Sequence, residues 1–132
     1  MCDYVEKNYT GISDKIKHFE DNVLFNKSNK GKTVFMIFKA TWCGACKKYK
    51  EEYEEMCRYN GKNGIVMTII DVDSAPDLRE EYGVDAFPTT FVYKVDDELL
   101  NSKHKKLELH REKIVGYSSG TLQKLMKKYN GI

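Results

Sequence analysis

Apolar residues near the start of the chain recur at the spacing of one helical face. Four of them lie at positions i, i+4, i+7 and i+11, namely Ile12, Ile16, Phe19 and Val23. That spacing stacks side chains on one side of an α-helix, and Ser13 or Asp14 is available as its cap. The pattern predicts a helix over residues 13–27, which ends at the polar stretch NKSNKGK.

Three short apolar runs, partly β-branched, predict strands. The runs TVFMIFKA (33–40) and GIVMTIIDVD (64–73) are apolar almost throughout, which is typical of strands buried on both faces of a sheet. A third run, TTFVYKV, covers residues 89–95. The first of them follows Gly31 directly after the predicted helix, and we expect it to be the central strand.

Helical patterns separate these strands. A second helix is expected to begin at the cysteines, because Cys46, Tyr49, Tyr53 and Met56 share one face and Gly61 lies beyond its end. A short helix is expected over 75–83, and a last one is marked by Leu122, Leu125, Met126 and Tyr129. The stretch REKIVGY (111–117) can pair with the preceding strand as a hairpin. The alternating order predicts an α/β fold.

Length and local composition suggest how the chain is divided. Its 132 residues correspond to about one domain, so we expect residues 1–132 to fold as a single unit. Residues 1–12 are expected to be a loose N-terminal segment. Residues 96–110, DDELLNSKHKKLELH, have nearly balanced charges and no apolar periodicity before Leu107. We therefore expect an extended hairpin loop there.

Charge and hydropathy exclude several classes of partner. Lys and Arg number 22 against 20 Asp and Glu, and the two signs are mixed along the chain, so neither a nucleic acid nor a membrane surface is expected to bind. The sequence has no apolar run resembling a signal peptide, and none approaches the roughly 20 residues of a membrane span. We expect a cytoplasmic monomer in which the four cysteines are mostly thiols.

The stretch KATWCGACKK (39–48) carries the clearest chemistry in the sequence. Two cysteines separated by two residues serve either in metal sites or in disulfide exchange. A structural zinc site needs four ligands, whereas Cys2 lies at the terminus and Cys57 follows Cys46 by 11 residues, about three helical turns. The three histidines are scattered. We therefore favour redox chemistry and expect neither a metal nor another cofactor.

The predicted start of the second helix suits that chemistry. Free N–H groups and the positive end of the helix dipole favour a thiolate, and they lower a cysteine pKa from about 8.5 toward 7 or below in such motifs. Gly44 and Ala45 leave room for a bridge between Cys43 and Cys46 to close. Trp42 could be an ordinary core residue, but directly before a loop-to-helix junction it is expected to shape the surface that partners meet.

At these residues the chain resembles the thioredoxin family. FKATWCGACK is similar to that family's strand-to-helix active site, YGVDAFPTTFVY is similar to the segment that carries its cis-proline, and Gly116 is similar to the glycine of its last strand. The resemblance runs over about residues 13–130. It implies the thioredoxin fold, in which a central mixed β-sheet is flanked by helices on both faces.

The resemblance also implies roles for individual residues. Cys43 would be the exposed nucleophile that attacks a substrate disulfide, and Cys46 would be the buried thiol that resolves the mixed disulfide. Pro88 would be cis, so that the backbone of Phe87 can pair with an extended substrate segment. The implied substrate-binding residues are Trp42, Gly44, Ala45, Phe87, Pro88 and Gly116. Lys47 matches a basic residue common after the second cysteine, with surface solvation as the alternative.

Several positions depart from the family pattern. Ala45 replaces the central proline of the active-site loop, and Glu51 stands where a helix-kinking proline is common. Ile37 replaces a buried acid, and Ile69 replaces the lysine that often partners it. Lys39 shares the strand face of Ile37, and we expect it to assist Cys43 more than Cys46, with water accepting the proton. The alternative is a surface lysine at the end of the strand.

These observations leave three functions to compare. The first is a reductant of protein disulfides that is recharged by an electron donor such as a thioredoxin reductase, and we favour it. An oxidase or isomerase is less well supported, since Ala45 rather than histidine occupies the active-site loop. The third is a thioredoxin-like adaptor that binds through Trp42, Phe87 and the 96–110 segment, with redox activity incidental.

Overall fold

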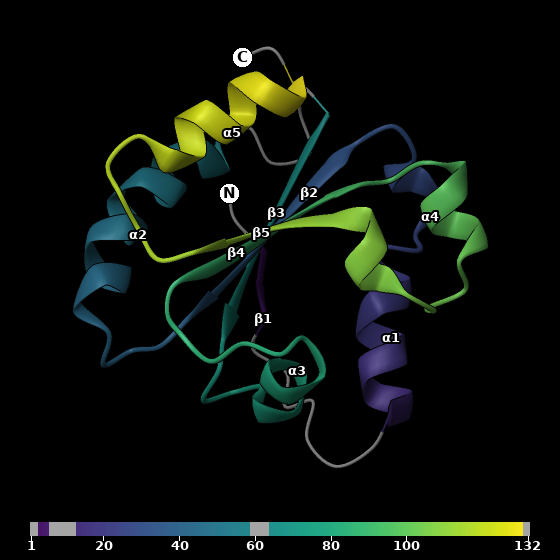
Figure 1. Ribbon diagram of the computed structural model, residues 1–132, viewed down its shortest axis with the longest axis horizontal. Helices are drawn as coiled ribbons and strands as arrows, with labels where there is room; N and C mark the ends of the chain where they lie inside the picture. Colours follow the sequence, from purple (N-terminus) through teal and green to yellow (C-terminus); the bar gives the residue numbers. More distant parts are fainter. Residues whose placement is uncertain (1–2, 6–12, 59–63, 131–132) are drawn as a thin grey trace.

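The computed structural model describes residues 3–5, 13–58 and 64–130, which form one mixed sheet with helices packed on both sides (Figure 1). The strands are β1 (Asp3–Val5), β2 (Thr33–Lys39), β3 (Ile65–Asp71), β4 (Thr89–Lys94) and β5 (Arg111–Val115). The α-helices are α1 (Ser13–Val23), α2 (Gly44–Cys57), α3 (Pro76–Glu81), α4 (Asp97–Asn101) and α5 (Thr121–Asn130). Two 3₁₀ turns, η1 (Lys27–Asn29) and η2 (Leu107–His110), complete the elements.

The five strands are arranged in the order β1-β3-β2-β4-β5. Strand β2 pairs in parallel with β3 and antiparallel with β4, while β1 pairs in parallel with β3 and β5 antiparallel with β4. The prediction of β2 as the central strand is confirmed, and so is the mixed sheet. Every position of β2 except Lys39 is buried, because helices cover both faces of the sheet at this central strand.

Alternation along β2 divides the core into two layers. Val34, Met36 and Phe38 point to one face, where they pack with residues of α1, α3 and α4. Phe35 and Ile37 point to the other face, where they pack with residues of α2 and α5. Side chains alternate across a strand, so a run that is apolar at every position is buried on both faces. Figure 1 shows the two sets of helices on opposite sides of the sheet.

The ends of the chain differ from the expectation in part. Residues 3–5 are not loose, because they form β1 and place Asp3 opposite Thr68 and Val5 opposite Ile70. The first predicted helix begins as expected but ends at Val23 rather than at residue 27. There Asn26 accepts a hydrogen bond from the Ser28 N–H and caps η1 instead. Ile12 and Gly61 lie outside the described residues.

The prediction of an extended loop over 96–110 is wrong. The segment does join the antiparallel strands β4 and β5, but it contains α4 and η2. The Asp96 carboxylate accepts the Leu99 N–H at 2.9 Å and caps α4. The side chains of Leu99 and Leu107 are both buried in the core. The sequence pattern did not reveal this packing, because a helix of five residues is too short for a 3.6-residue period to repeat.

The same segment is fixed to α1 by polar contacts. Nδ1 of His104 lies 2.7 Å from Oε1 of Glu20, and Nε2 lies 2.8 Å from Oδ1 of Asp21. The buried Glu20 also accepts a 2.6 Å hydrogen bond from the hydroxyl of Tyr82 on the other side. The His104 ring packs on Phe25, with 4.0 Å between the ring centroids. Residues 96–110 are therefore part of the packed structure.

Candidate active site

The two cysteines of the CGAC sequence meet at the start of α2. Cys43 is the N-cap residue of this helix, in an extended backbone conformation, and its Sγ accepts the N–H of Cys46 at 3.1 Å. The Lys47 N–H reaches the Cys43 carbonyl at 3.3 Å, and the Cys43 N–H reaches that of Ala40 at 3.2 Å. Cys43 thus precedes the first turn and Cys46 lies inside it, and both are free thiols.

Both thiols are largely covered. Cys43 is only 8% exposed, so the expectation of an exposed residue is wrong, although Cys46 is more deeply buried at 3%. The cause is the position of Cys43 Sγ between the helix terminus and the backbone of Phe87, whose carbonyl oxygen accepts the thiol at 3.5 Å. The sulfur atom of Cys43 therefore contacts the backbone of Cys46 and the backbone of Phe87, which lies 44 positions after Cys43 in the sequence.

Electrostatic effects on Cys46 oppose one another. Burial is the largest effect and raises the pKa of the Cys46 thiol, and the hydrogen bond with Cys43 raises it further. The backbone at Ala40 and the ammonium group of Lys39 lower this pKa. The sequence suggested that Lys39 would assist mainly Cys43, and the structure adds an effect on Cys46. Formation of a thiolate at Cys46 therefore depends on nearby positive charge.

The second segment of the site carries the proline. The Phe87–Pro88 peptide is cis, as predicted. The Gly116 N–H donates a 2.8 Å hydrogen bond to the Pro88 carbonyl oxygen, and the Thr89 hydroxyl donates to that of Ala86 at 2.7 Å. Pro88 and Gly116, which the sequence placed in the site from separate stretches, are thus brought together at the ends of β4 and β5.

Aromatic side chains surround the cysteines on the outer surface. Trp42 is 67% exposed and meets the ring of Phe87 edge to face at 5.5 Å, so it is a surface residue and not part of the core. The guanidinium of Arg79 lies 5.1 Å from the Phe87 ring centroid, and its Nε donates to the Val84 carbonyl oxygen. Sequence reasoning did not identify Arg79, because nothing in α3 marks it as close to the cysteines.

The remaining predicted residues lie near the same helix terminus. Gly44, Ala45 and Lys47 are exposed on the first turn of α2. Ile37 and Ile69 are buried neighbours on β2 and β3, so the family's acid and lysine are replaced by an apolar pair in direct register. Lys39 pairs with Asp71 two positions further along both strands, with 3.8 Å between Nζ and Oδ2.

Cys57 differs from the expectation of a free thiol. It is buried at the end of α2, as expected, but it is disulfide-bonded, and its partner lies outside the described residues. Cys2 also lies outside them. The expectation failed because a pairing depends on which cysteines the fold brings within bonding distance, and spacing along the chain does not show that.

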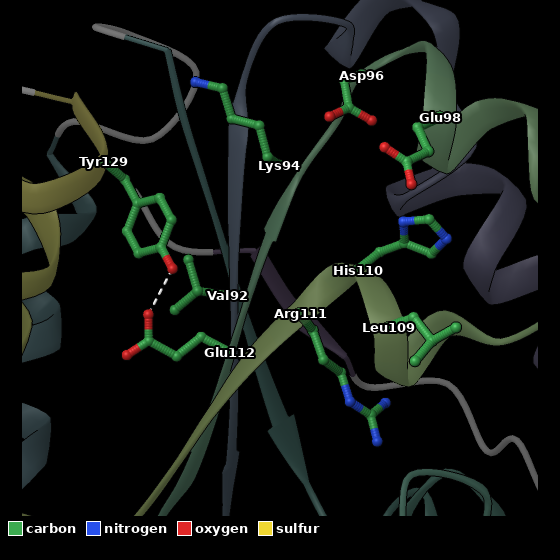
Figure 2. A pocket seen from close by; sticks show the side chains of 9 residues that line it. All are labelled: Val92, Lys94, Asp96, Glu98, Leu109, His110, Arg111, Glu112 and Tyr129. Carbon is green, nitrogen blue, oxygen red and sulfur yellow. Dashed lines mark hydrogen bonds between the residues drawn. The ribbon is translucent and has the colours of Figure 1, made fainter.

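A hollow of about 320 Å³ lies where β4 ends and β5 begins (Figure 2). Pro88 precedes the first residue of β4 and therefore lies at the other end of that strand. The hollow is lined in part by Lys94, the last residue of β4, and by Arg111, the first residue of β5. Across it the Tyr129 hydroxyl donates a hydrogen bond to Glu112. None of its described lining residues is a cysteine. This hollow is therefore separate from the dithiol.

The described residues were also searched for other kinds of site. Among residues 3–5, 13–58 and 64–130, no group of three or more His, Cys, Asp and Glu side chains is arranged to hold a metal ion. Within the same ranges, no helix combines the length and the apolar character needed to cross a membrane.

Comparisons with known proteins agree with this geometry. The thioredoxin family model matches residues 11–117. The chain is 41% identical to a thioredoxin of Coprinus comatus over 88 residues, covering 64% of this chain and 83% of that protein. It is 33% identical to thioredoxin H5 of Oryza sativa subsp. japonica over 110 residues, covering 80% of this chain and 78% of that protein.

Solved structures share the fold. A thioredoxin of Malassezia sympodialis has a TM-score of 0.68 at 20% identity, covering 98% of this chain and 91% of that one. A thioredoxin of Fasciola hepatica has a TM-score of 0.66 at 16% identity, covering 96% of this chain and 98% of that one. Together with the CGAC dithiol at the start of α2 and the cis-proline beside it, these similarities show that the chain belongs to the thioredoxin family of thiol-disulfide oxidoreductases.

Proposed function

We propose that Cys43 and Cys46 carry out the family's reduction of protein disulfides. The Cys43 thiolate attacks one sulfur of a substrate disulfide; a Cys43–substrate bond forms, the substrate S–S bond breaks, and one substrate sulfur leaves and takes up a proton. The Cys46 thiolate then attacks Cys43 Sγ, which closes the Cys43–Cys46 disulfide and releases the second substrate thiol. Two electrons pass from the protein to the substrate.

One observation carries this assignment of roles. Sγ of Cys43 accepts the Cys46 N–H at the N-terminus of α2 and also lies against the Phe87 carbonyl. Backbone N–H donors and the positive end of the helix dipole favour a thiolate at that atom, and the Phe87 backbone beside it could pair with an extended substrate segment. Cys46 lies deeper, next to Cys43 and within reach of a mixed disulfide on it.

The substrate is proposed to bind over the same surface. An extended segment would pair with the backbone of Phe87 before cis-Pro88, contact Trp42, and pass the small residues Gly44 and Ala45. Gly116, whose N–H holds the Pro88 carbonyl, borders this path. Lys47, exposed after the second cysteine, would contribute positive charge at its edge.

The oxidised protein needs a source of electrons to act again. A dithiol donor such as a thioredoxin reductase would attack the Cys43–Cys46 disulfide and regenerate both thiols, while its own dithiol becomes a disulfide. We propose that this cycle takes place in the cytoplasm and that the protein acts as a monomer. A mitochondrial thioredoxin of Mus musculus is 35% identical over 103 residues, covering 74% of this chain and 58% of that protein. Imaging of the tagged full-length protein tests this location, and a mitochondrial signal would contradict it.

Reduction of insulin disulfides in the presence of dithiothreitol tests the activity. The wild-type protein should accelerate insulin precipitation, and Cys43→Ser should abolish the acceleration. Leu109→Ala is the control and should retain it, because Leu109 is exposed and lines the hollow where β4 ends and β5 begins, away from Cys43. Absence of any activity above the dithiothreitol background in the folded wild type would favour the adaptor function instead.

The order of attack is tested by trapping. In Cys46→Ser the mixed disulfide cannot be resolved, so substrates should accumulate on Cys43 and be released by excess reductant. If Cys43→Ser captured substrates through Cys46 equally well, the two roles would have to be exchanged.

A further inference from the structure

The buried charge that the family places below the cysteines is absent from this protein. Ile37 and Ile69 occupy the two positions, face each other across β2 and β3, and are fully or almost fully buried. Neither side chain can accept a proton or stabilise a charge. Resolution of the mixed disulfide, as proposed above, still requires a thiolate at Cys46, whose formation burial opposes.

A charged pair lies one step further along the same strands. Lys39 and Asp71 are opposite each other in the parallel register two residues after the isoleucines, and therefore on the same face of the sheet. Nζ of Lys39 lies 3.8 Å from Oδ2 of Asp71. Their side chains are 23% and 22% exposed, so the pair is mostly shielded from solvent. Charges in such a position act over longer distances than charges in open water.

The backbone fixes this pair at the active-site end of the sheet. The Lys39 carbonyl accepts the Val72 N–H at 3.0 Å, and the Asp71 carboxylate accepts the Asp73 N–H at 2.9 Å. Lys39 is the last residue of β2, four positions before Cys43. The two charges are thus held where the chain turns from the sheet into the cysteine loop.

We propose that Lys39 and Asp71 act on Cys46 with opposite signs. The Lys39 ammonium stabilises the Cys46 thiolate that resolves the mixed disulfide, and Asp71 is a positioning residue that holds Lys39 in place while partly cancelling its charge. The Cys46 proton passes to water. The Cys43–Cys46 bond then forms as the bond from Cys43 to the substrate breaks, and the departing substrate sulfur takes up a proton. This proposal rests on the dithiol mechanism proposed above.

The surroundings of Cys46 support this arrangement. Burial and Cys43 raise the pKa of the Cys46 thiol, whereas the Ala40 backbone and the Lys39 ammonium lower it. Burial raises the pKa of Tyr53 on α2. Negative charge on neighbouring groups, among them Cys46 and Asp71, raises the same pKa further. Lys39 is thus the cation that pairs with Asp71 at 3.8 Å and favours the charged form of Cys46.

Two substitutions separate the charge of the pair from its structure. Lys39→Met keeps the length of the side chain and removes the cation. Asp71→Asn keeps an oxygen that can accept from Lys39 and removes the anion. Lys30→Met and Asp97→Asn are the matched controls, since this exposed pair, at 2.8 Å, lies at the other end of β2 and carries the same two charges.

The measurement uses the reduced full chain and the chromogenic disulfide dithiobis(nitrobenzoate) in stopped flow. Attack by Cys43 releases a first coloured thiolate and leaves the mixed disulfide on Cys43. Attack by Cys46 on that mixed disulfide releases a second one, so the second phase reports resolution alone. Cys46→Ser should lack the second phase. If the wild type lacks it too, the proposed dithiol mechanism fails, independently of the role of Lys39 and Asp71.

The proposal requires the two variants to move in opposite directions. Near neutral pH the second phase should become about tenfold slower in Lys39→Met and several-fold faster in Asp71→Asn, because a tenfold change in thiolate fraction corresponds to about one pH unit. The pH profile of the second phase should shift upward in the first variant and downward in the second. The two control variants should leave both phases unchanged.

Other outcomes would overturn the proposal. If both variants slowed the second phase, or neither changed it, Lys39 and Asp71 would be a structural ion pair without influence on Cys46. Urea unfolding of each variant, measured in parallel, identifies a loss of folded protein. If Lys39→Met does not fold, Lys39→Gln replaces it, and if Asp71→Asn does not fold, Asp71→Ser replaces it. The rate of the second phase must then shift in the same opposite directions.

Discussion

Replacement of His104 by alanine tests whether the 96–110 segment is part of the folded structure. Its two ring nitrogens lie 2.7 and 2.8 Å from carboxylate oxygens of Glu20 and Asp21. A histidine donates from both nitrogens only when its ring carries the second proton. Glu20 is 5% exposed, and its other oxygen accepts the Tyr82 hydroxyl. The substitution removes one of the two side-chain partners of a buried carboxylate.

The expected loss follows from these contacts. Leaving a buried polar group without a partner costs about 1–3 kcal/mol, and the upper part of that range applies to a charged group. Loss of the ring contact with Phe25 adds about 0.5–1 kcal/mol, whereas the more exposed pair with Asp21 adds little. We expect His104→Ala to lower the free energy of unfolding by about 3 kcal/mol. For a chain of this size that lowers the Tm by about 12 °C.

Urea unfolding followed by circular dichroism, together with thermal melts, measures the effect. His18→Ala is the matched control, because His18 is exposed on the same helix and its ring lies 3.2 Å from the side-chain amide of Asn22. It should change stability by less than about 0.5 kcal/mol. Adding Glu20→Gln to His104→Ala removes the unpaired charge and should restore about 1 kcal/mol. A loss in His104→Ala no larger than in His18→Ala would refute the reasoning.

Three further predictions concern the core and the site. Burial raises the pKa of four tyrosines, Tyr49, Tyr53, Tyr82 and Tyr93. A tyrosine in the unfolded chain ionises near pH 10, so the free energy of unfolding should stay constant up to about that pH. Above it, the free energy of unfolding should fall by about 1.4 kcal/mol per pH unit for each buried tyrosine. Urea unfolding that gives the same free energy between pH 9 and about 11 would contradict this. Leu99→Ala should cost about 2–5 kcal/mol, since Leu99 is fully buried, whereas Leu109→Ala, at 71% exposure, should cost less than about 0.5 kcal/mol in the same assay. Trp42→Ala should raise the KM for insulin several-fold and leave the urea midpoint unchanged, because Trp42 is exposed and packs on Phe87; an unchanged KM would remove Trp42 from the substrate path.

Much of the fold could be predicted because its signals are local. An apolar run of seven residues such as β2 is buried on both faces, whichever strands later pair with it, so it could be assigned from its own composition. The dithiol could be placed at a helix start for the same reason, since Cys43 and Cys46 are three positions apart, at the N-cap and in the first turn of one helix. The cis state of Pro88 came from the family resemblance, not from the residues alone.

The tertiary structure decided what depends on residues distant in sequence. Glu20 and His104 are 84 positions apart, and no periodicity within either segment indicates that the 96–110 segment folds against α1. The disulfide at Cys57 and the position of Arg79 on Phe87 likewise depend on how the elements pack. The sequence pointed to Lys39 as a cation near the cysteines but not to Asp71, and only the parallel register of β2 and β3 makes the two a shielded pair. The sequence by itself determined the elements and the reactive groups, whereas the charges and partners around those groups follow from register and packing, which exist only once the chain has folded.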